Sequence, residues 1–140
     1  MNNHYQLVII GGGPAGLAAA ATASAKGISC AVLDEQPEPG GQIYRAIESV
    51  PDQRAQKLGS EYLRGKELAA AFRESDAEYY PGTRVWSLNK ELEIGIIQND
   101  EASMITADQI IIANGAMERP VPFPGWTKPG VMQAGAGQIL

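Results

Sequence analysis

The chain has 140 residues, a formal charge of −5 and a hydrophobic content of 44%, which is enough apolar side chain for one folded core. The negative charge and the lack of a basic stripe argue against a surface for nucleic acid or anionic membrane. One cysteine and one histidine exclude an internal disulfide and a His/Cys metal cluster, and this composition fits the cytoplasm.

The N-terminal part predicts a strand–helix–strand unit. Residues 4–10, HYQLVII, form a β-rich apolar run that stops at glycine, which predicts a buried strand. Pro14 suits the first turn of a helix that alanines continue as far as Gly27. Residues 28–34, ISCAVLD, predict a second strand, parallel to the first. Glycines and Pro14 interrupt the apolar stretch, so we expect neither a signal peptide nor a membrane span.

The middle of the chain changes its periodicity. Residues 35–52 are rich in proline and glycine and predict a loop. Apolar residues between 55 and 72 recur at helical spacing, and Gly59-Ser60 divides this helical region into two pieces. The later pattern is that of strands: a third parallel strand, a three-stranded meander and one more buried strand, at residues 77–80, 83–88, 91–98, 101–106 and 108–116.

These elements predict an α/β fold, in which a Rossmann-like parallel sheet with flanking helices is joined to a three-stranded antiparallel β-meander. We expect residues 1–116 to form a nucleotide-binding domain that is incomplete. Residues 117–140 are rich in proline and glycine and show little periodicity, so we expect a linker to a further domain. The chain stops within AGAGQIL, which favours a fragment of a longer protein.

A glycine motif lies between the first strand and the first helix. Gly11, Gly13 and Gly16 form GxGxxG, with Pro14 and Ala15 inside it. The first glycine permits a tight turn, the second lets a pyrophosphate approach bare backbone, and the third allows close helix–strand packing. The helix N-terminus adds N–H donors and a positive dipole end. In this strand–helix–strand context the motif predicts a dinucleotide site.

An acidic pair follows the second strand. Asp34 lies eighteen residues after Gly16, where a carboxylate can accept hydrogen bonds from an adenosine ribose, and Glu35 is the alternative. The next residue is Gln36, so no cation follows directly to bind a ribose 2′-phosphate, which disfavours NADP.

Two further glycine segments, PGGQ at 39–42 and IIIANGA at 110–116, complete a resemblance that covers nearly the whole chain. The sequence resembles the two-dinucleotide-binding-domain flavoproteins, the superfamily of thioredoxin reductase and the FAD/NAD(P)-dependent dehydrogenases. The resemblance implies that FAD is the cofactor here and that NAD could bind in a further domain. It implies contacts with FAD for Gly11, Gly13, Pro14, Ala15, Gly16, Asp34, Glu35, Gly40, Gly41, Gln42, Val85, Ala113, Asn114 and Gly115.

One branch of the superfamily is most similar. VLDEQPEPGGQIYRAI and GAMERPVPFPGWTKPGVMQAGAGQ resemble the α subunits of opine oxidase, hydrogen cyanide synthase and dye-linked proline dehydrogenases. This similarity implies a flavoprotein subunit that works with a second, amine-oxidising subunit on an amino acid or opine. It also implies that the 140 residues alone retain FAD weakly and have no turnover.

Two departures from the superfamily pattern are clear. Asn114 replaces the threonine of the usual A-T-G, and the segment after the linker has no CxxC pair, which excludes disulfide chemistry of the thioredoxin reductase kind. The residues assemble no nucleophile–base pair, so we name no catalytic residue. Cys30 is expected to be a small core residue. Tyr44 and Arg45 remain unassigned, and Arg45 could contact a phosphate, a partner or only solvent.

Two other functions remain open. The chain could be a plain NAD-binding dehydrogenase domain, or a non-catalytic module that binds an adenine nucleotide for assembly or regulation. Identification of the bound nucleotide would separate them.

Overall fold

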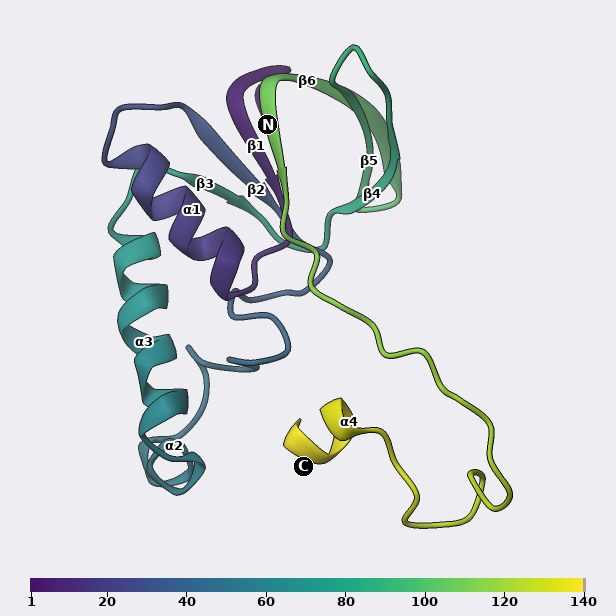
Figure 1. The fold of residues 1–140 in the computed structure, drawn as a ribbon. Helices are drawn as coiled ribbons and strands as arrows, with labels where there is room; N and C mark the ends of the chain where they lie inside the picture. Colours follow the sequence, from purple (N-terminus) through teal and green to yellow (C-terminus); the bar gives the residue numbers. More distant parts are fainter. Residues whose placement is uncertain (140) are drawn as a thin grey trace.

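A single mixed sheet organises the computed structural model, which describes residues 1–139 (Figure 1). The strand order is β3-β2-β1-β6-β5-β4. In chain order the elements are β1 (His4–Ile10), α1 (Pro14–Ser24), β2 (Cys30–Leu33), α2 (Asp52–Leu58), α3 (Ser60–Arg73), β3 (Glu78–Tyr80), β4 (Arg84–Leu88), β5 (Glu93–Gln98), β6 (Glu101–Ile112) and α4 (Ala134–Ile139).

The parallel half of the sheet confirms the predicted strand–helix–strand unit. β1 pairs in parallel with β2 and β6, and β2 pairs in parallel with β3. Helices α1 and α3 lie on one face, where Ile9, Leu17, Val32 and Phe72 form an apolar cluster. Because both faces of β1 and β2 are covered, these strands read as continuous apolar runs.

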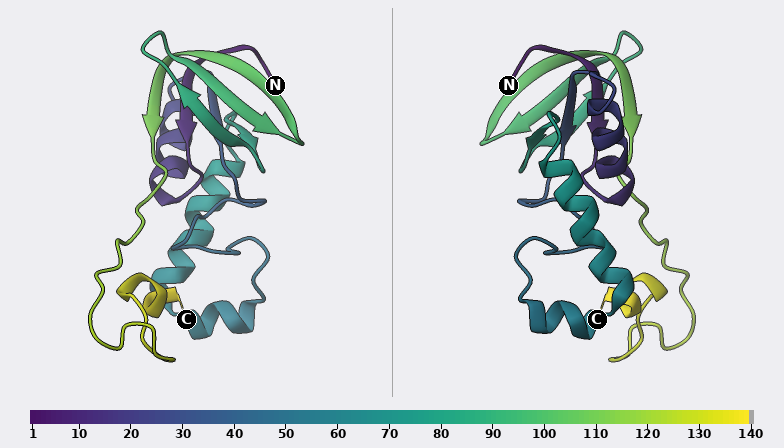
Figure 2. Two further views of the ribbon diagram at one scale, coloured as in Figure 1. Left: turned by 90° about the vertical axis from the view of Figure 1, so that its right-hand side faces the viewer. Right: turned by 90° about the vertical axis from the view of Figure 1, so that its left-hand side faces the viewer.

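The antiparallel half covers the opposite face. β4, β5 and the first part of β6 form the predicted meander, which curves over the sheet on the side away from α1 and α3 (Figures 1 and 2). There Ile94, Ile96 and Ile105 pack against Val8 and Leu33. The predicted fold class, a parallel sheet with flanking helices plus a meander, is therefore confirmed.

The two strands expected at residues 101–106 and 108–116 are in fact one. β6 runs for 12 residues from Glu101 to Ile112. Its first half pairs antiparallel with β5, its second half pairs parallel with β1, and Thr106 has a register partner in both. The single strand appeared as two because it exchanges one partner for another at Thr106.

The expectation that the second half of β6 is buried is also wrong. Ile112 is 63% exposed and Ile111 is 39% exposed. Among the described residues, β5 leaves β6 at Thr106, and α1 packs on β1 and β2. Ile110 still packs against the meander-side core, while Ile111 and Ile112 stay exposed.

The helical and C-terminal regions differ little from prediction. The expected break between two helices occurs at Gly59, whose φ is +94°. Residues 113–133 leave the sheet without regular structure (Figure 1), and the short helix α4 was not predicted. The Glu118 carboxylate accepts a hydrogen bond from the backbone N–H of Gly135 at 3.1 Å. Within the described chain, no helix is long and apolar enough to cross a bilayer.

Candidate functional site

The turn between β1 and α1 is packed too closely for side chains. Gly11 has a φ of +108°, and a Cβ atom there would overlap the carbonyl oxygen of Ala113. A Cβ atom on Gly16 would overlap the carbonyl oxygen of Gly11. The first and third glycines of the motif therefore allow the chain to turn and the helix to pack against it, as the motif predicts.

The middle glycine stands at the start of α1 and leaves space beside it. Gly13 is the N-cap residue with extended backbone, and a Cβ atom there would meet no atom closer than 3.9 Å. Pro14 lies in the first turn, which carries neither a capping side chain nor an acidic residue. The helix therefore presents its N–H groups, those of Ala15 and Gly16 among them, and its positive dipole end to an anion.

Asp34 links the end of β2 to this turn. Its carboxylate accepts hydrogen bonds from the backbone N–H of Gly12 at 2.6 Å and from that of Gln36 at 2.9 Å. The Tyr79 ring packs on the same side of Gly12 as the Asp34 carboxylate, and a Cβ atom on Gly12 would come within 3.1 Å of the ring. Burial, with the charge of Asp34 as a second cause, raises the pKa of the Tyr79 phenol. Asp34 thus holds the glycine turn in place in addition to its expected role at the ribose.

The start of β4 meets the end of β2, which sequence spacing alone did not show. The backbone N–H of Thr83, a buried residue, donates to the carbonyl of Asp34 at 2.8 Å. Val85 follows two residues later, and its side chain packs against the meander-side core. The contact between Thr83 and Asp34 also brings Arg84 within 3.9 Å of the Glu35 carboxylate. A cation therefore does lie near the acidic pair, although none follows Asp34 directly in the sequence.

The glycine pair after β2 packs directly on the glycine turn. The backbone N–H of Gly40 donates to the carbonyl of Gly12 at 2.8 Å. A Cβ atom on Gly41 would come within 2.8 Å of the Cα atom of Gly13. Only glycine permits this approach of two backbones, so the pair shapes one side of the turn. Gln42, the next residue, is exposed.

Three side-chain contacts anchor the following loop to α3. The Tyr44 ring lies over Gly65 so closely that a Cβ atom on Gly65 would come within 2.6 Å of it. The Tyr62 hydroxyl donates to the carbonyl of Arg45 at 2.6 Å. Arg73 forms a two-pronged ion pair with Glu48 at 2.7 and 2.9 Å. The loop that carries the glycine pair is thus held by α3 on one side and by the glycine turn on the other.

The end of β6 completes the site. The backbone N–H of Ala113 donates to the carbonyl of Ile10 at 2.8 Å, and the Ala113 carbonyl fills the space that Gly11 leaves free. Asn114 is exposed, and Gly115 has a φ of +74°. The structure therefore brings the three glycine segments and Asp34 to one edge of the sheet, where the parallel strands end.

The groups at this edge of the sheet are suited to binding a ligand. Backbone N–H groups and the acidic pair can hold an elongated anion with an attached sugar. Cys30 is 3% exposed within the helix-side core, and burial raises the pKa of its thiol to about 11, which confirms the expected role as a core residue. Among residues 1–139, no three His, Cys, Asp or Glu side chains form a group that could hold a metal ion.

Comparisons with known proteins agree with this geometry. The sequence profile of the pyridine nucleotide-disulphide oxidoreductase family matches residues 5–136. An opine oxidase subunit of Agrobacterium tumefaciens (strain Ach5) is 46% identical over a 147-residue alignment that covers 99% of this chain and 29% of the relative. Hydrogen cyanide synthase subunit HcnB of Pseudomonas aeruginosa is 37% identical, with coverage of 94% and 29%.

The fold has counterparts among solved structures. L-proline dehydrogenase from P. horikoshii superposes with a TM-score of 0.64 at 22% sequence identity, over 84% of this chain and 24% of that protein. The chain spans less than a third of the length of these relatives. The family match over residues 5–136 confirms the resemblance expected from the motifs, and the chain belongs to the pyridine nucleotide-disulphide oxidoreductase family.

Proposed function

We propose that this chain binds the ADP part of FAD and forms the N-terminal portion of a flavin-dependent oxidoreductase subunit. One observation carries the proposal: α1 begins without a capping side chain directly at Gly13, whose bare backbone leaves room beside it. A helix start of this kind offers N–H donors and a positive dipole end to a pyrophosphate.

The residues around the turn fit the rest of an ADP group. Asp34 and Glu35 are the proposed partners of the ribose hydroxyls, and Val85 lies in β4 at the start of the meander. Gly40, Gly41 and Asn114 border the same turn from two other segments. The meeting of three glycine segments at one turn supports FAD over NAD, since the flavoprotein superfamily that the sequence resembles uses these segments to bind FAD.

In this proposal the chain's own residues bind and orient the nucleotide. The isoalloxazine ring of FAD would supply the redox chemistry when bound. The described residues at the turn provide donors, a carboxylate pair and close-packed backbone, so we expect no turnover by the 140 residues alone.

The partner and the compartment belong to the same proposal. Relatives named as subunits of opine oxidase and hydrogen cyanide synthase support a second, amine-oxidising subunit and a substrate of the amino-acid or opine type. A cysteine that is free and buried supports a cytoplasmic location, because that compartment keeps thiols reduced.

The first test identifies the bound nucleotide. The purified chain is denatured by heat, the released ligand is identified by mass spectrometry, and affinities for FAD, ADP and NADH are measured by calorimetry. We expect FAD and ADP to bind with similar affinity, since both contain the ADP group. Tight NADH binding without FAD binding would refute the proposal in favour of an NAD domain. Release of ADP or ATP, with no affinity for FAD, would identify a non-catalytic nucleotide module.

A substitution test localises the pyrophosphate. Gly13→Ala places a methyl group beside the helix start, where the backbone is in an extended conformation that alanine adopts without strain. We expect the affinity for ADP to fall about tenfold, while the melting temperature stays within about 2 °C of the wild type. Gly137→Ala is the matched control, because its Cβ atom would also meet nothing closer than 3.8 Å and it lies in α4. Equal ADP affinity in both variants would contradict the proposed pyrophosphate position.

A further inference from the structure

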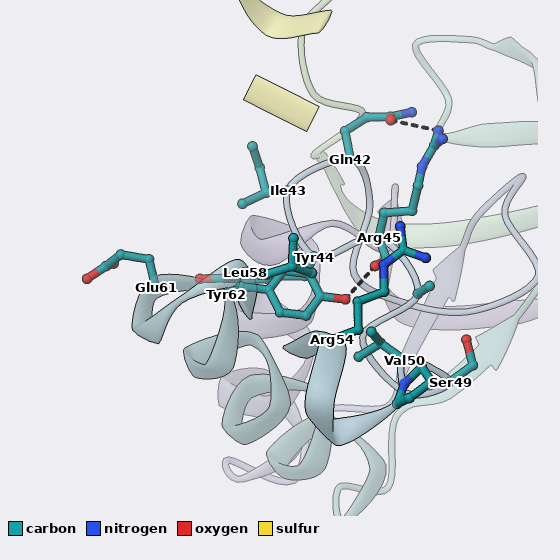
Figure 3. Close-up of a pocket in the computed structure, with 12 residues that line it drawn as sticks. Gln42, Ile43, Tyr44, Arg45, Ser49, Val50, Arg54, Leu58, Glu61 and Tyr62 are labelled. Carbon is teal, nitrogen blue, oxygen red and sulfur yellow. Dashed lines mark hydrogen bonds between the residues drawn. The ribbon is translucent and has the colours of Figure 1, made fainter. Parts of the chain in front are cut away.

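A cavity lies beside the loop that follows the glycine pair. Its volume is about 770 Å³, and it opens between residues 42–51 and the helices α2 and α3 (Figure 3). Of the residues expected to contact the dinucleotide, only Gln42 lines it. The glycine turn and Asp34 lie outside its lining, so the cavity is separate from the proposed ADP site.

Two arginines line the cavity, and neither has an ion-pair partner among the described residues. Arg45 donates through Nη2 to the amide oxygen of Gln42 at 2.9 Å, which is a neutral partner. Arg54 extends from α2 in the direction of Arg45 (Figure 3), and its side chain has no hydrogen bond or ion pair within the described residues. The lining carboxylate of Glu61 is paired with Arg64 at 2.9 Å. Two guanidinium groups are therefore free to face an anion, in a chain whose net charge is −5.

Apolar side chains line the same cavity. Ile43 and Leu58 are 52% and 49% exposed, which is unusual enough for large aliphatic residues to mark a binding surface when they lie together. The Tyr44 and Tyr62 rings meet edge to face, with centroids 6.4 Å apart. The cavity therefore combines cations with an apolar surface, as sites for small organic ligands do.

The donor set favours a carboxylate. The Tyr62 hydroxyl is committed to the carbonyl of Arg45, and the Ser49 hydroxyl donates to Glu38 at 2.9 Å. The guanidinium groups are the charged donors of the lining, and their planar fork matches the two oxygens of a carboxylate. A phosphate dianion carries more charge and more acceptor oxygens than two guanidinium groups match.

We propose that this cavity binds an organic carboxylate, with its charged group on Arg45 and Arg54 and its apolar body against Ile43 and Leu58. The site is additional to the proposed nucleotide site and does not depend on it.

The test uses benzoate as the probe and benzamide as its uncharged counterpart. Each is titrated into the ¹⁵N-labelled 140-residue chain, and amide shifts are followed by NMR. We expect benzoate to shift residues 42–46 and 58–62 and to bind about tenfold more tightly than benzamide. Arg45→Gln and Arg54→Gln should each lower the affinity for benzoate about tenfold. Arg54→Lys should lower it less, since lysine keeps the charge but lacks the planar fork.

Controls separate the site from general electrostatics and from the nucleotide site. Lys57→Gln makes the same change of charge on α2 outside the cavity lining, and it should leave benzoate affinity unchanged. Saturating ADP should also leave the benzoate shifts in place, and a failure of ADP to bind would not affect them. Equal binding of benzamide, equal weakening by Lys57→Gln, or displacement of benzoate by ADP would each overturn the proposal. The ¹⁵N spectrum of each variant shows whether it is folded.

Discussion

Asp34 connects the end of β2 to the glycine turn, so its carboxylate should contribute to stability before any nucleotide binds. The substitution Asp34→Asn preserves size and one oxygen and removes the charge. The two hydrogen bonds at stake are those from the backbone N–H groups of Gly12 and Gln36. Gly12 is buried and Gln36 is exposed, so we expect the remaining oxygen to stay with Gly12.

The magnitude follows from what asparagine cannot do. Its amide NH₂ group faces the N–H of Gln36 as a second donor, and the bond to Gly12 loses its charge. Hydrogen bonds to charged groups contribute about 1.5–3 kcal/mol each. Because water can replace the lost bond at the exposed Gln36, we expect the free energy of unfolding to fall by about 2 kcal/mol. For a domain of this size that corresponds to a decrease of about 8 °C in melting temperature.

Urea unfolding followed by circular dichroism measures this effect in the chain without nucleotide. The control is Glu35→Gln, which removes the neighbouring carboxylate. That carboxylate is exposed, and its ion pair with Arg84 is long, at 3.9 Å, so its loss should lower the free energy of unfolding by less than about 0.5 kcal/mol. If Asp34→Asn and Glu35→Gln unfold at the same urea concentration, the carboxylate of Asp34 does not hold the turn.

Three further predictions concern the core and the loop. Gly16→Ala should lower the free energy of unfolding by about 3 kcal/mol, because its Cβ atom overlaps the carbonyl oxygen of Gly11; wild-type stability in urea would show that the turn can relax. Glu48→Gln should lower the free energy of unfolding by about 1 kcal/mol, because it breaks the two-pronged ion pair with Arg73. In 1 M salt the difference in unfolding free energy between wild type and variant should shrink. A difference that does not depend on salt would refute the ionic explanation. Burial raises the pKa of Cys30 from its ordinary value of 9.0 to about 11, so above pH 9 the unfolded chain releases a proton that the folded chain keeps. The free energy of unfolding should therefore decrease between pH 9 and 11 more steeply in the wild type than in Cys30→Ala, and equal slopes in urea titrations would contradict this.

The local part of the fold was predictable because neighbouring residues determine it. The bounds of β1 match the prediction at both ends, since a continuous apolar run stopped by Gly11 has few other readings. α1 ends at Ser24, three residues before the predicted stop at Gly27. The glycine motif, the acidic pair and the two later glycine segments meet as expected, because parallel strands end at one edge of a sheet.

Contacts between distant segments were not predictable in the same way. Glu48 and Arg73 are 25 residues apart, and no local pattern connects them. The approach of Arg84 to Glu35 depends on how far the meander curves over the sheet. β6 was divided into two strands because its halves follow different patterns, one beside β5 and one beside β1. The cavity lined by Arg45 and Arg54 forms only when α2, α3 and the loop of residues 42–51 pack together.

The pairing of β1 with β6 also determines when the site can form during folding. His4 lies opposite Thr106 in the register, so the two strands join only after a loop of about 100 residues closes, which is an entropically costly and slow type of contact. The glycine turn precedes β6 in the chain, yet the space that Gly11 leaves free is filled by the carbonyl of Ala113, directly after β6. A nucleotide that binds this turn would therefore select chains in which β6 has already closed on β1, and it would stabilise that last step by mass action.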